Sequence, residues 1–490
     1  MFSTAEFSVA KCLAAQETWL VVGDQDNAES REVWAHLKTV YQLEDSQLLE
    51  LDFPDGDELN RTQWEDQLRP IVVQWLQAND PDQRYTKIVT LYGLPLSVGP
   101  WDDDRETKPW LDFYQNALIQ TTGQFNRSLS KLGEVAGLKY DAIQSSNELE
   151  PYRTGFDQFA NKVQAAIAGL ATEKQRDVGA RLQTTVQEIA GINPFLASLQ
   201  RDAESGKSQA NVQFQYLRGR IEALDNVGAL LERVPPSFER ESLAMSLLEQ
   251  SGGLLATIGW IQQQIAMVLD NDSAASLDSE LACLLWPEYR RLGTVPNFAH
   301  PAFANSPLTN KYPTFQVSRL DGPTVAIAKA LVDRAKAAET MTFEGNVYLD
   351  LRGIDQGDTQ TVRYERWMKA IGQQFQNVAG VKVVQEKTPQ LFAADACPDA
   401  LLYCGWYSLG KSIDSFTFKP GGVAYHLVPG DALGIHQVDD QGWCKYFLEK
   451  GATRIIGSVG EIQPVDFQLD GGKLKFAPPV LSSGLVEFGL

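Results

Sequence analysis

Cysteine and histidine are scarce in this sequence, and neither is arranged for metal binding or redox chemistry. The five cysteines are scattered along 490 residues and form no CxxC pair, which excludes a zinc knuckle and a thioredoxin-like motif. The four histidines lack the spacing of a metal site. We therefore expect free thiols in a reducing compartment.

Basic side chains and long apolar runs are also lacking. The chain has 43 Lys and Arg residues against 63 Asp and Glu residues, which gives a net charge of −20. Such an acidic protein repels phosphate backbones and anionic lipids, so we expect no nucleic-acid partner. No apolar run reaches the roughly 18 residues that a membrane span needs. Because the N-terminus has no sustained apolar core, we expect a cytoplasmic protein, or a secreted one where a leader precedes this sequence.

Four familiar catalytic motifs are absent. The sequence contains no Walker A loop, no GxGxxG, no GxSxG and no HExxH. P-loop nucleotide hydrolysis, Rossmann dehydrogenation, α/β-hydrolase esterolysis and zincin proteolysis therefore lose their usual sequence support.

The first hundred residues alternate between strand and helix patterns. Short apolar runs at 19–23, 48–51 and 85–98 predict strands, and the segments between them have apolar residues at helical spacing. This β-α-β-α-β order predicts a parallel sheet with helices on its faces. In such sheets ligands bind beyond the carboxyl ends of the strands, near Asp24 and Gly93 in this sequence.

A long central segment has a different pattern. From about Lys108 to Asp272 the strand signals disappear, and apolar residues recur every three or four positions. This pattern predicts a helical bundle or hairpin. Because strand and helix patterns then resume, we predict one α/β domain in two sequence halves, 1–107 and 276–490, interrupted by an all-helical insertion at 108–275.

Seven segments in this order resemble one uncharacterised bacterial protein family of unknown function. The family pattern is a GxPL strand, an SxDSEL segment, RLDGPT, GWYS, an AxHL strand and a closing GATxxxG(N/S)VxE. The corresponding segments here are LYGLPLSV (91–98), SLDSELACLL (276–285), SRLDGPTVAIAKALVDRA (318–335), YLDLRG (348–353), GWYS (405–408), VAYHL (423–427) and EKGATRIIGSVGE (449–461).

This family has no known activity, but it is distantly similar to the caspase–gingipain type of α/β fold. In those peptidases a His follows one central strand and a Cys nucleophile follows the next. The corresponding strand ends here carry Trp406-Tyr407-Ser408 and His426, and no cysteine lies close after the second strand. The resemblance therefore implies a doubly wound, mostly parallel, caspase-like sheet without the peptidase nucleophile.

Two carboxylates in the SLDSEL segment are candidate binding residues. If the segment is extended, Asp278 and Glu280 share a face, where they could bind a hard cation or divide acid and base roles. On a helix they point about 200° apart. In that case Asp278 is expected to cap the helix, with Glu280 in its first turn. A divalent cation is thus compatible with the sequence but not required by it.

Charged residues also follow other predicted strands. Arg319 and Asp321 precede a helix, where Arg319 could clamp a carboxylate or phosphate, or form a structural ion pair. Asp350 and Arg352 flank the end of a predicted central strand, where a functional site and an ion pair are equally compatible with the pattern. Glu461 closes the last predicted strand and turn, and we expect it at the same pocket.

Aromatic and nucleophilic candidates follow the two central strands of the resemblance. Trp406 and Tyr407 suit stacking on a sugar, a base or a peptide, or form a rigid turn at the sheet edge. His426 lies on an apolar strand, which favours a core histidine. The functional alternative makes His426 a general base and Ser408 a nucleophile.

Three function hypotheses follow from the sequence. The leading one is a non-catalytic or degenerate caspase-like protein that binds a protein partner through its helical insertion. The second is a hydrolase with unfamiliar chemistry that uses Ser408, His426 and the carboxylates. The third is a carbohydrate- or peptide-binding module built on Trp406 and Tyr407.

Overall fold

A computed structural model gives the fold of the chain from Trp19 onward. It describes residues 19–490 except 102–106, 145–147, 150, 153–154, 168–211, 235–239, 271–272, 287–294, 304–307, 355–359, 409, 461, 463, 471–472, 479 and 482–483. Cys12, Glu461 and the predicted helices within 168–211 lie outside the described residues.

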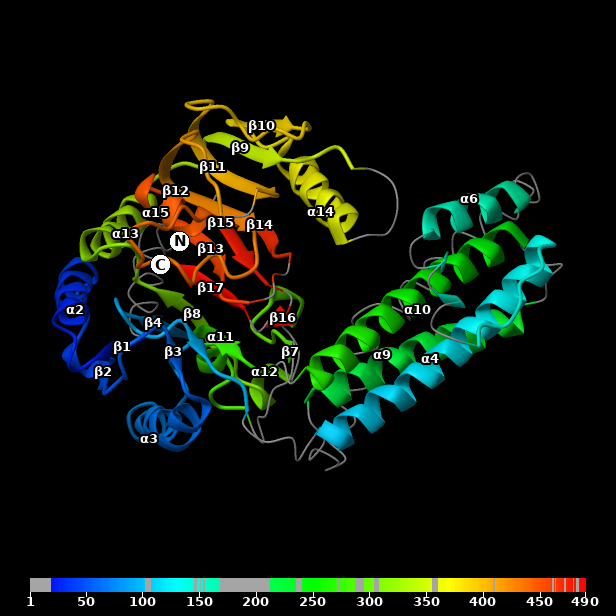
Figure 1. Ribbon diagram of the computed structural model, residues 1–490, viewed down its shortest axis with the longest axis horizontal. Coiled ribbons are helices and arrows are strands. Elements are labelled where there is room, and N and C mark those ends of the chain that lie inside the picture. Colours follow the sequence, from blue (N-terminus) through cyan, green and yellow to red (C-terminus); the bar gives the residue numbers. More distant parts are fainter. Residues whose placement is uncertain are drawn as a thin grey trace, which may run out of the picture.

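One ten-stranded sheet forms the centre of the molecule (Figure 1). Its order is β10 (Val381–Glu386), β9 (Gly345–Asp350), β11 (Cys397–Trp406), β12 (Phe416–Leu427), β13 (Arg454–Ser458), β17 (Leu485–Phe488), β8 (Gln316–Arg319), β4 (Lys87–Thr90), β1 (Trp19–Asp24) and β2 (Leu48–Leu51). Neighbouring strands are parallel except β13 and β17, which are antiparallel. The prediction of an α/β protein with a mostly parallel sheet is confirmed.

The antiparallel pair divides the sheet into two parallel halves that run in opposite directions. The C-terminal strand β17 pairs with β13 on one side and, at Phe488 and Arg319, with β8 on the other. Next to β8 lies β4, in register from Lys87–Gln316 to Thr90–Arg319. The first hundred residues therefore share backbone pairing with segments more than 200 residues later.

The two halves have the same winding order, although the sequence contains no recognisable internal repeat. In each half the first strand lies between the second and the third, and the fourth follows: β2-β1-β4-β8 and β10-β9-β11-β12. In each half the chain passes from the first strand to a strand on one side of it and then crosses back to a strand on its other side. Each half therefore has a switch point beside its first strand, β1 or β9. Open parallel sheets bind ligands at such points, beyond the carboxyl ends of the strands.

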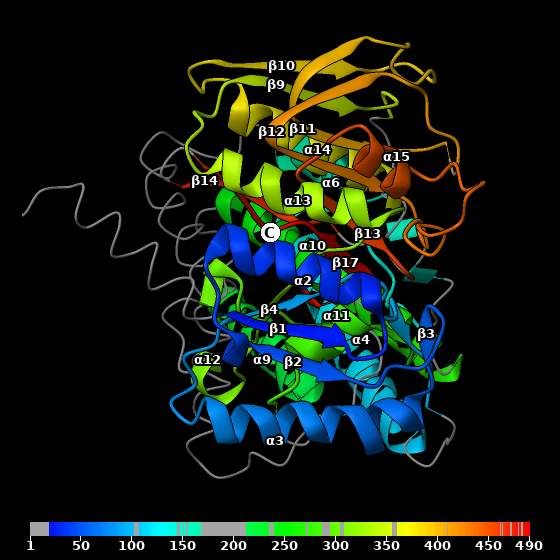
Figure 2. The same ribbon diagram turned by 90° about the vertical axis from the view of Figure 1, so that its left-hand side faces the viewer.

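Helices cover both faces of the sheet (Figures 1 and 2). α2 (Ala28–Tyr41), α13 (Val325–Ala338) and α15 (Trp443–Glu449) lie on one side, and α14 (Gln360–Phe375) lies on the other with the hairpin β14 (Asp466–Asp470) and β15 (Lys473–Ala477). α2 illustrates the local sequence logic. Asn27 accepts hydrogen bonds from the first-turn amides of Glu29 and Ser30, and apolar residues at three- and four-residue spacing face inward.

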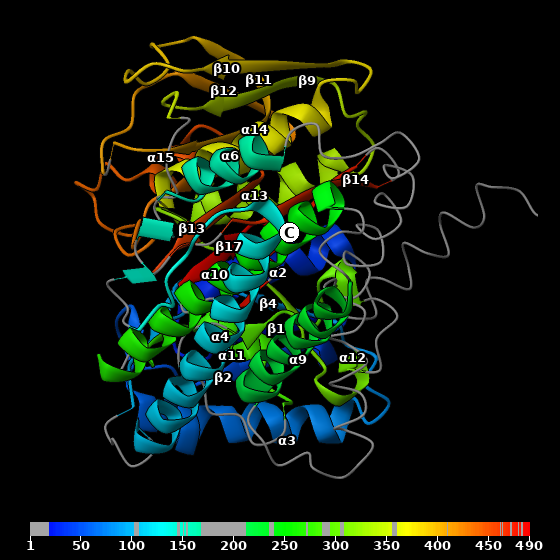
Figure 3. The same ribbon diagram turned by 90° about the vertical axis from the view of Figure 1, so that its right-hand side faces the viewer.

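Four helices between β5 (Ser97–Val98) and β6 (Ala275–Ser276) pack against one another away from the sheet (Figures 1 and 3). They are α4 (Thr107–Ala136), α6 (Phe156–Ile167), α9 (Val212–Arg233) and α10 (Arg240–Leu269). Their buried residues form two apolar clusters of their own, one around Phe125 and Leu247 and one around Tyr114 and Ile261. Among the described residues, none of the helices has the length and apolar character that crossing a membrane requires.

Short elements complete the described fold. They are η1 (Asp45–Gln47), β3 (Glu58–Leu59), η2 (Gln63–Leu68), α3 (Arg69–Asn79), β5 (Ser97–Val98), β6 (Ala275–Ser276), α11 (Leu277–Ala282), β7 (Val295–Pro296), η3 (Pro301–Phe303), α12 (Leu308–Lys311) and β16 (Val480–Leu481).

Candidate functional site

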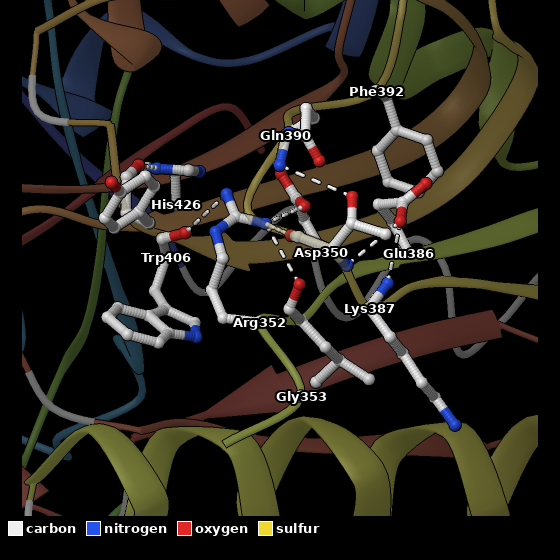
Figure 4. Close-up of polar contacts among 12 residues, drawn as sticks. Asp350, Arg352, Gly353, Glu386, Lys387, Gln390, Phe392, Trp406 and His426 are labelled. Carbon is white, nitrogen blue, oxygen red and sulfur yellow. Dashed lines mark hydrogen bonds and ion pairs between the residues drawn. The ribbon is translucent and has the colours of Figure 1, made fainter.

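The candidate site lies where β9, β11 and β12 end side by side. Gly405 on β11 is level with Asp350 on β9 and with His426 on β12. Figure 4 shows Arg352 between Asp350 and Trp406 at these ends. This is the switch point of the second half, so the structure brings the residues predicted at these three strands into one place.

Directly after β11 the chain makes a strained turn, the strand-end turn, formed by Trp406, Tyr407 and Ser408. Tyr407 has φ of 86° and Ser408 has φ of 60°, so two consecutive residues other than glycine are left-handed. Such a conformation costs on the order of 1–3 kcal/mol per residue and persists only where the surroundings enforce it.

Three side chains enforce the strand-end turn by donating to its three carbonyl oxygens. Arg352 Nη2 donates to the Trp406 carbonyl at 3.3 Å, and His426 Nε2 meets the Tyr407 carbonyl at 2.6 Å. Trp443 Nε1 donates to the Ser408 carbonyl at 2.9 Å. Because each donor comes from a different element, the turn is fixed from three sides.

His426 is buried and occupied at both ring nitrogens. Its Nε2 faces the Tyr407 carbonyl, which only accepts, so Nε2 carries the proton and Nδ1 accepts from the Tyr403 hydroxyl at 2.8 Å. The ring also stacks on Trp443, with centroids 4.0 Å apart. Burial lowers the pKa of His426 to about 3. His426 therefore has the hydrogen bonds of a neutral core histidine.

Ser408 is not activated by this histidine. Its hydroxyl donates to the Lys411 carbonyl at 3.0 Å, and no hydrogen bond links it to His426. A serine nucleophile needs a base within hydrogen-bond reach. The geometry therefore gives no support to the predicted Ser408–His426 pair.

Arg352 and Asp350 form a buried ion pair that ties three strand ends together. Arg352 Nη1 lies 2.6 Å from Asp350 Oδ1 and also contacts the Thr388 carbonyl after β10 at 3.2 Å (Figure 4). Burial raises the pKa of Asp350, and the bond to Arg352 opposes this rise. The arginine thus lies between the ends of β9, β10 and β11.

Glu365 on α14 fixes the same region from the side. Its Oε1 accepts from the Arg352 amide at 2.6 Å and from the Trp406 indole at 2.8 Å. Its Oε2 accepts from the Gly353 amide at 3.1 Å. The indole nitrogen of Trp406 is therefore bonded inside the protein, whereas Tyr407 is 51% exposed. The Tyr407 ring also covers the Arg352 guanidinium, 4.8 Å away.

Asp278 and Glu280 do not join this site. They lie on α11, whose N-cap is Ser276 rather than Asp278, and they point to different partners, as expected for a helix. Asp278 pairs with Arg319 at 2.7 Å and Glu280 pairs with Arg61 at 2.9 Å. Each carboxylate is thus committed to a buried arginine.

Arg319 has a structural role at the end of β8. Besides Asp278, its guanidinium donates to the Leu94 carbonyl at 3.1 Å and to the Pro95 carbonyl at 2.7 Å. It is fully buried. Arg319 therefore holds the GLP turn after β4 in place and does not form an open anion clamp.

Asp321 belongs to a cluster that the sequence did not predict. Fully buried Asp321 lies 2.9 Å from His436 Nε2, and Asp57 lies 3.3 Å from His436 Nδ1. The ring of Tyr92 meets the imidazole edge-on at 5.6 Å. His436 reaches this position because the loop after β12 carries it across to the end of β8, so only the folded chain reveals the contact.

The Asp57–His436–Asp321 cluster holds a charged imidazole. Burial alone lowers the pKa of His436, but the bonds to the two carboxylates outweigh it and raise the pKa to about 10. The bond to His436 in turn lowers the pKa of Asp57. At neutral pH the cluster is therefore an ion-paired latch between the two halves of the sheet.

The cysteines of the described residues are buried. They are Cys283, Cys397, Cys404 and Cys444, and burial raises the pKa of Cys397 to about 12. Within the described ranges, no three His, Cys, Asp or Glu side chains are grouped to hold a metal ion.

The comparisons with known proteins add no functional assignment. No protein-family model, curated protein or solved structure matches this chain.

We predict that Arg352→Met lowers the free energy of unfolding by about 3–5 kcal/mol, because it leaves the Asp350 carboxylate buried without a cation. Asp350→Asn combined with Arg352→Met should recover much of this loss. Urea denaturation measures both. As a control, Arg31→Met breaks an exposed ion pair with Glu50 and should cost about 0–1 kcal/mol. A cost of that size for Arg352→Met would contradict the role given to Arg352.

We predict that the latch stabilises the protein most at moderately acid pH. The pKa of His436 is raised from 6.5 to about 10, so its contribution is complete below pH 6.5 and is lost as pH rises through 10. Melting temperatures of wild type and His436→Gln should differ most between about pH 5 and 6.5. The curves should converge above pH 10. A difference that is constant with pH would contradict a charged His436.

Proposed function

We propose that this protein is a non-catalytic, degenerate caspase-like protein that acts by binding a protein partner. The observation that carries the proposal is the state of His426, which is buried and bonded at both ring nitrogens. A general base needs a free ring nitrogen beside its substrate and a pKa near the working pH. This histidine has neither and instead supports a strained turn.

The strand order of the second half supports the caspase-like part of the proposal. β11 and β12 are adjacent parallel strands, and the resemblance expects a histidine after one and a cysteine after the next. The turn Trp406–Ser408 follows β11, and Val428 and Pro429 follow β12. Neither expected catalytic residue occupies its position, which favours a protein that retains the fold without the reaction.

The helices α4, α6, α9 and α10 support the binding part of the proposal. They have their own apolar clusters and extend away from the sheet (Figure 1), so the described α/β part does not cover their outer faces. Ile119 on α4 is 70% exposed and Leu269 on α10 is 65% exposed, so these helices present apolar side chains to solvent. None of these helices contributes a residue to the strand-end turn.

In a Cys12→Ser background, we expect no covalent labelling of the native protein by a fluorophosphonate probe or by iodoacetamide, because Ser408 has no base within hydrogen-bond reach and the four thiols of the described residues are buried. Intact-protein mass spectrometry measures the adducts, and denatured protein serves as the positive control for the thiols. Fluorophosphonate labelling that disappears in Ser408→Ala would overturn the non-catalytic proposal in favour of the hydrolase.

Partner binding is tested separately with a photo-cross-linking amino acid. Placed at Ile119 it should give a discrete adduct in cell extract, whereas the same amino acid at Val438, which is 90% exposed on the α/β part, should not. Equal adducts at both positions, or none at either, would contradict a partner surface on the helices.

A further inference from the structure

A cavity of about 290 Å³ lies beside the central strands of the sheet. Its wall is formed by α11, β8, β13, β15 and β17, and none of the residues of the strand-end turn lines it. The volume is close to the lower end of the range typical of small-molecule sites, about 300–1,000 Å³. Such a space suits a small ligand.

Most of the wall is apolar, as in small-molecule sites generally. The apolar part comes from Phe315, Val317, Ile456, Phe476 and Val486. Charged residues also line this space, from four strands and one helix: Lys87 on β4, Arg454 on β13, Lys475 on β15, Glu487 on β17 and Asp278 on α11.

The two carboxylates of the cavity already have arginine partners. Glu487 lies 3.5 Å from Arg454 Nε, and Asp278 lies 2.7 Å from Arg319 Nε. The Arg454 side chain also packs over the ring of Phe476. These pairs leave neither acid to neutralise a further cation.

Lys87 is a cation of the cavity that has no described acid within ion-pair distance, although Glu487 acts on it from farther away. Its ammonium lies 5.1 Å from the centre of the Trp19 ring, and no ion pair or hydrogen bond joins it to another described residue. Burial, followed by repulsion from Arg454, lowers the pKa of Lys87 to about 7, although Glu487 acts in the opposite direction. A partly buried amine without an ion-pair partner gains from an anion supplied by a ligand.

We propose that the cavity binds a small carboxylic acid with an apolar body, whose carboxylate pairs with Lys87. The apolar wall contacts the apolar body of the ligand. The carboxylate of the ligand neutralises Lys87, because Glu487 and Asp278 are each already paired with an arginine. A phosphate ester or a dianion fits less well, because both acids line the same small space.

The test uses benzoate as the probe and benzamide as its neutral isostere, in isothermal titration calorimetry of the full chain. Wild type should bind benzoate, and benzamide should bind at least tenfold more weakly. Lys87→Met keeps the length of the side chain without its charge and should abolish the preference for benzoate. Lys329→Met removes a surface lysine paired with Glu32 on the opposite layer, and should leave binding unchanged.

A second readout needs only wild-type protein. At pH 8 the amine of empty Lys87 is mostly neutral, so benzoate binding should take up close to one proton, and at pH 5.5 almost none. Titrations in two buffers with different ionisation enthalpies measure this uptake. The other charged residues of the cavity are Arg454, Lys475, Glu487 and Asp278, and all four are present in each of these titrations.

Three results would overturn the proposal: no binding of benzoate to wild type, equal binding to Lys87→Met, or binding without proton uptake at pH 8. Since the cavity and the helices α4 to α10 are separate, failure here leaves the proposed partner binding untouched.

Discussion

The pairing of the C-terminal strand β17 in the middle of the sheet is the constraint on which the rest of the structure depends. Each half of the sheet winds in the same order, and β17 joins them by pairing antiparallel to β13 and parallel to β8. Its backbone amide at Glu487 also bonds to Asp278, which holds Arg319. One short strand therefore positions the buried ion pair, a wall of the cavity and the seam between the halves.

The strand-end turn of the candidate site is also held by hydrogen bonds from within the protein. A left-handed aromatic residue such as Tyr407 costs free energy, and Arg352, His426 and Trp443 offset it by saturating the carbonyl groups of the turn. Each of these carbonyl groups thus has a partner within the protein. The Tyr407 ring remains 51% exposed on this rigid support.

Local sequence patterns predicted individual strands and helices well. The place of each strand in the sheet and the partners of the site residues depend on distant segments of the chain. The strands at 19–23 and 48–51 follow directly from apolar runs, whereas SLDSEL was compatible with an extended segment or a helix and is a helix in the structure. The direction of β17 and its central place cannot be predicted from its four residues, because pairing across a sheet depends on distant segments.

The expectation that all candidate residues share one pocket was too simple. Asp278, Glu280, Arg319 and Asp321 pair elsewhere, and Glu461 lies outside the described residues. The contacts of His436 could not be predicted from the sequence, because its two partners, Asp57 and Asp321, are far away along the chain.

The most direct measurement is an NMR titration of the His426 ring in protein labelled with ¹⁵N at the histidine nitrogens. If binding has replaced catalysis, His426 stays neutral with the proton on Nε2 from pH 8 down to pH 4, since burial holds its pKa at about 3. A ring that takes up a proton near its ordinary pKa of 6.5 would instead be accessible and basic, and would contradict the central claim.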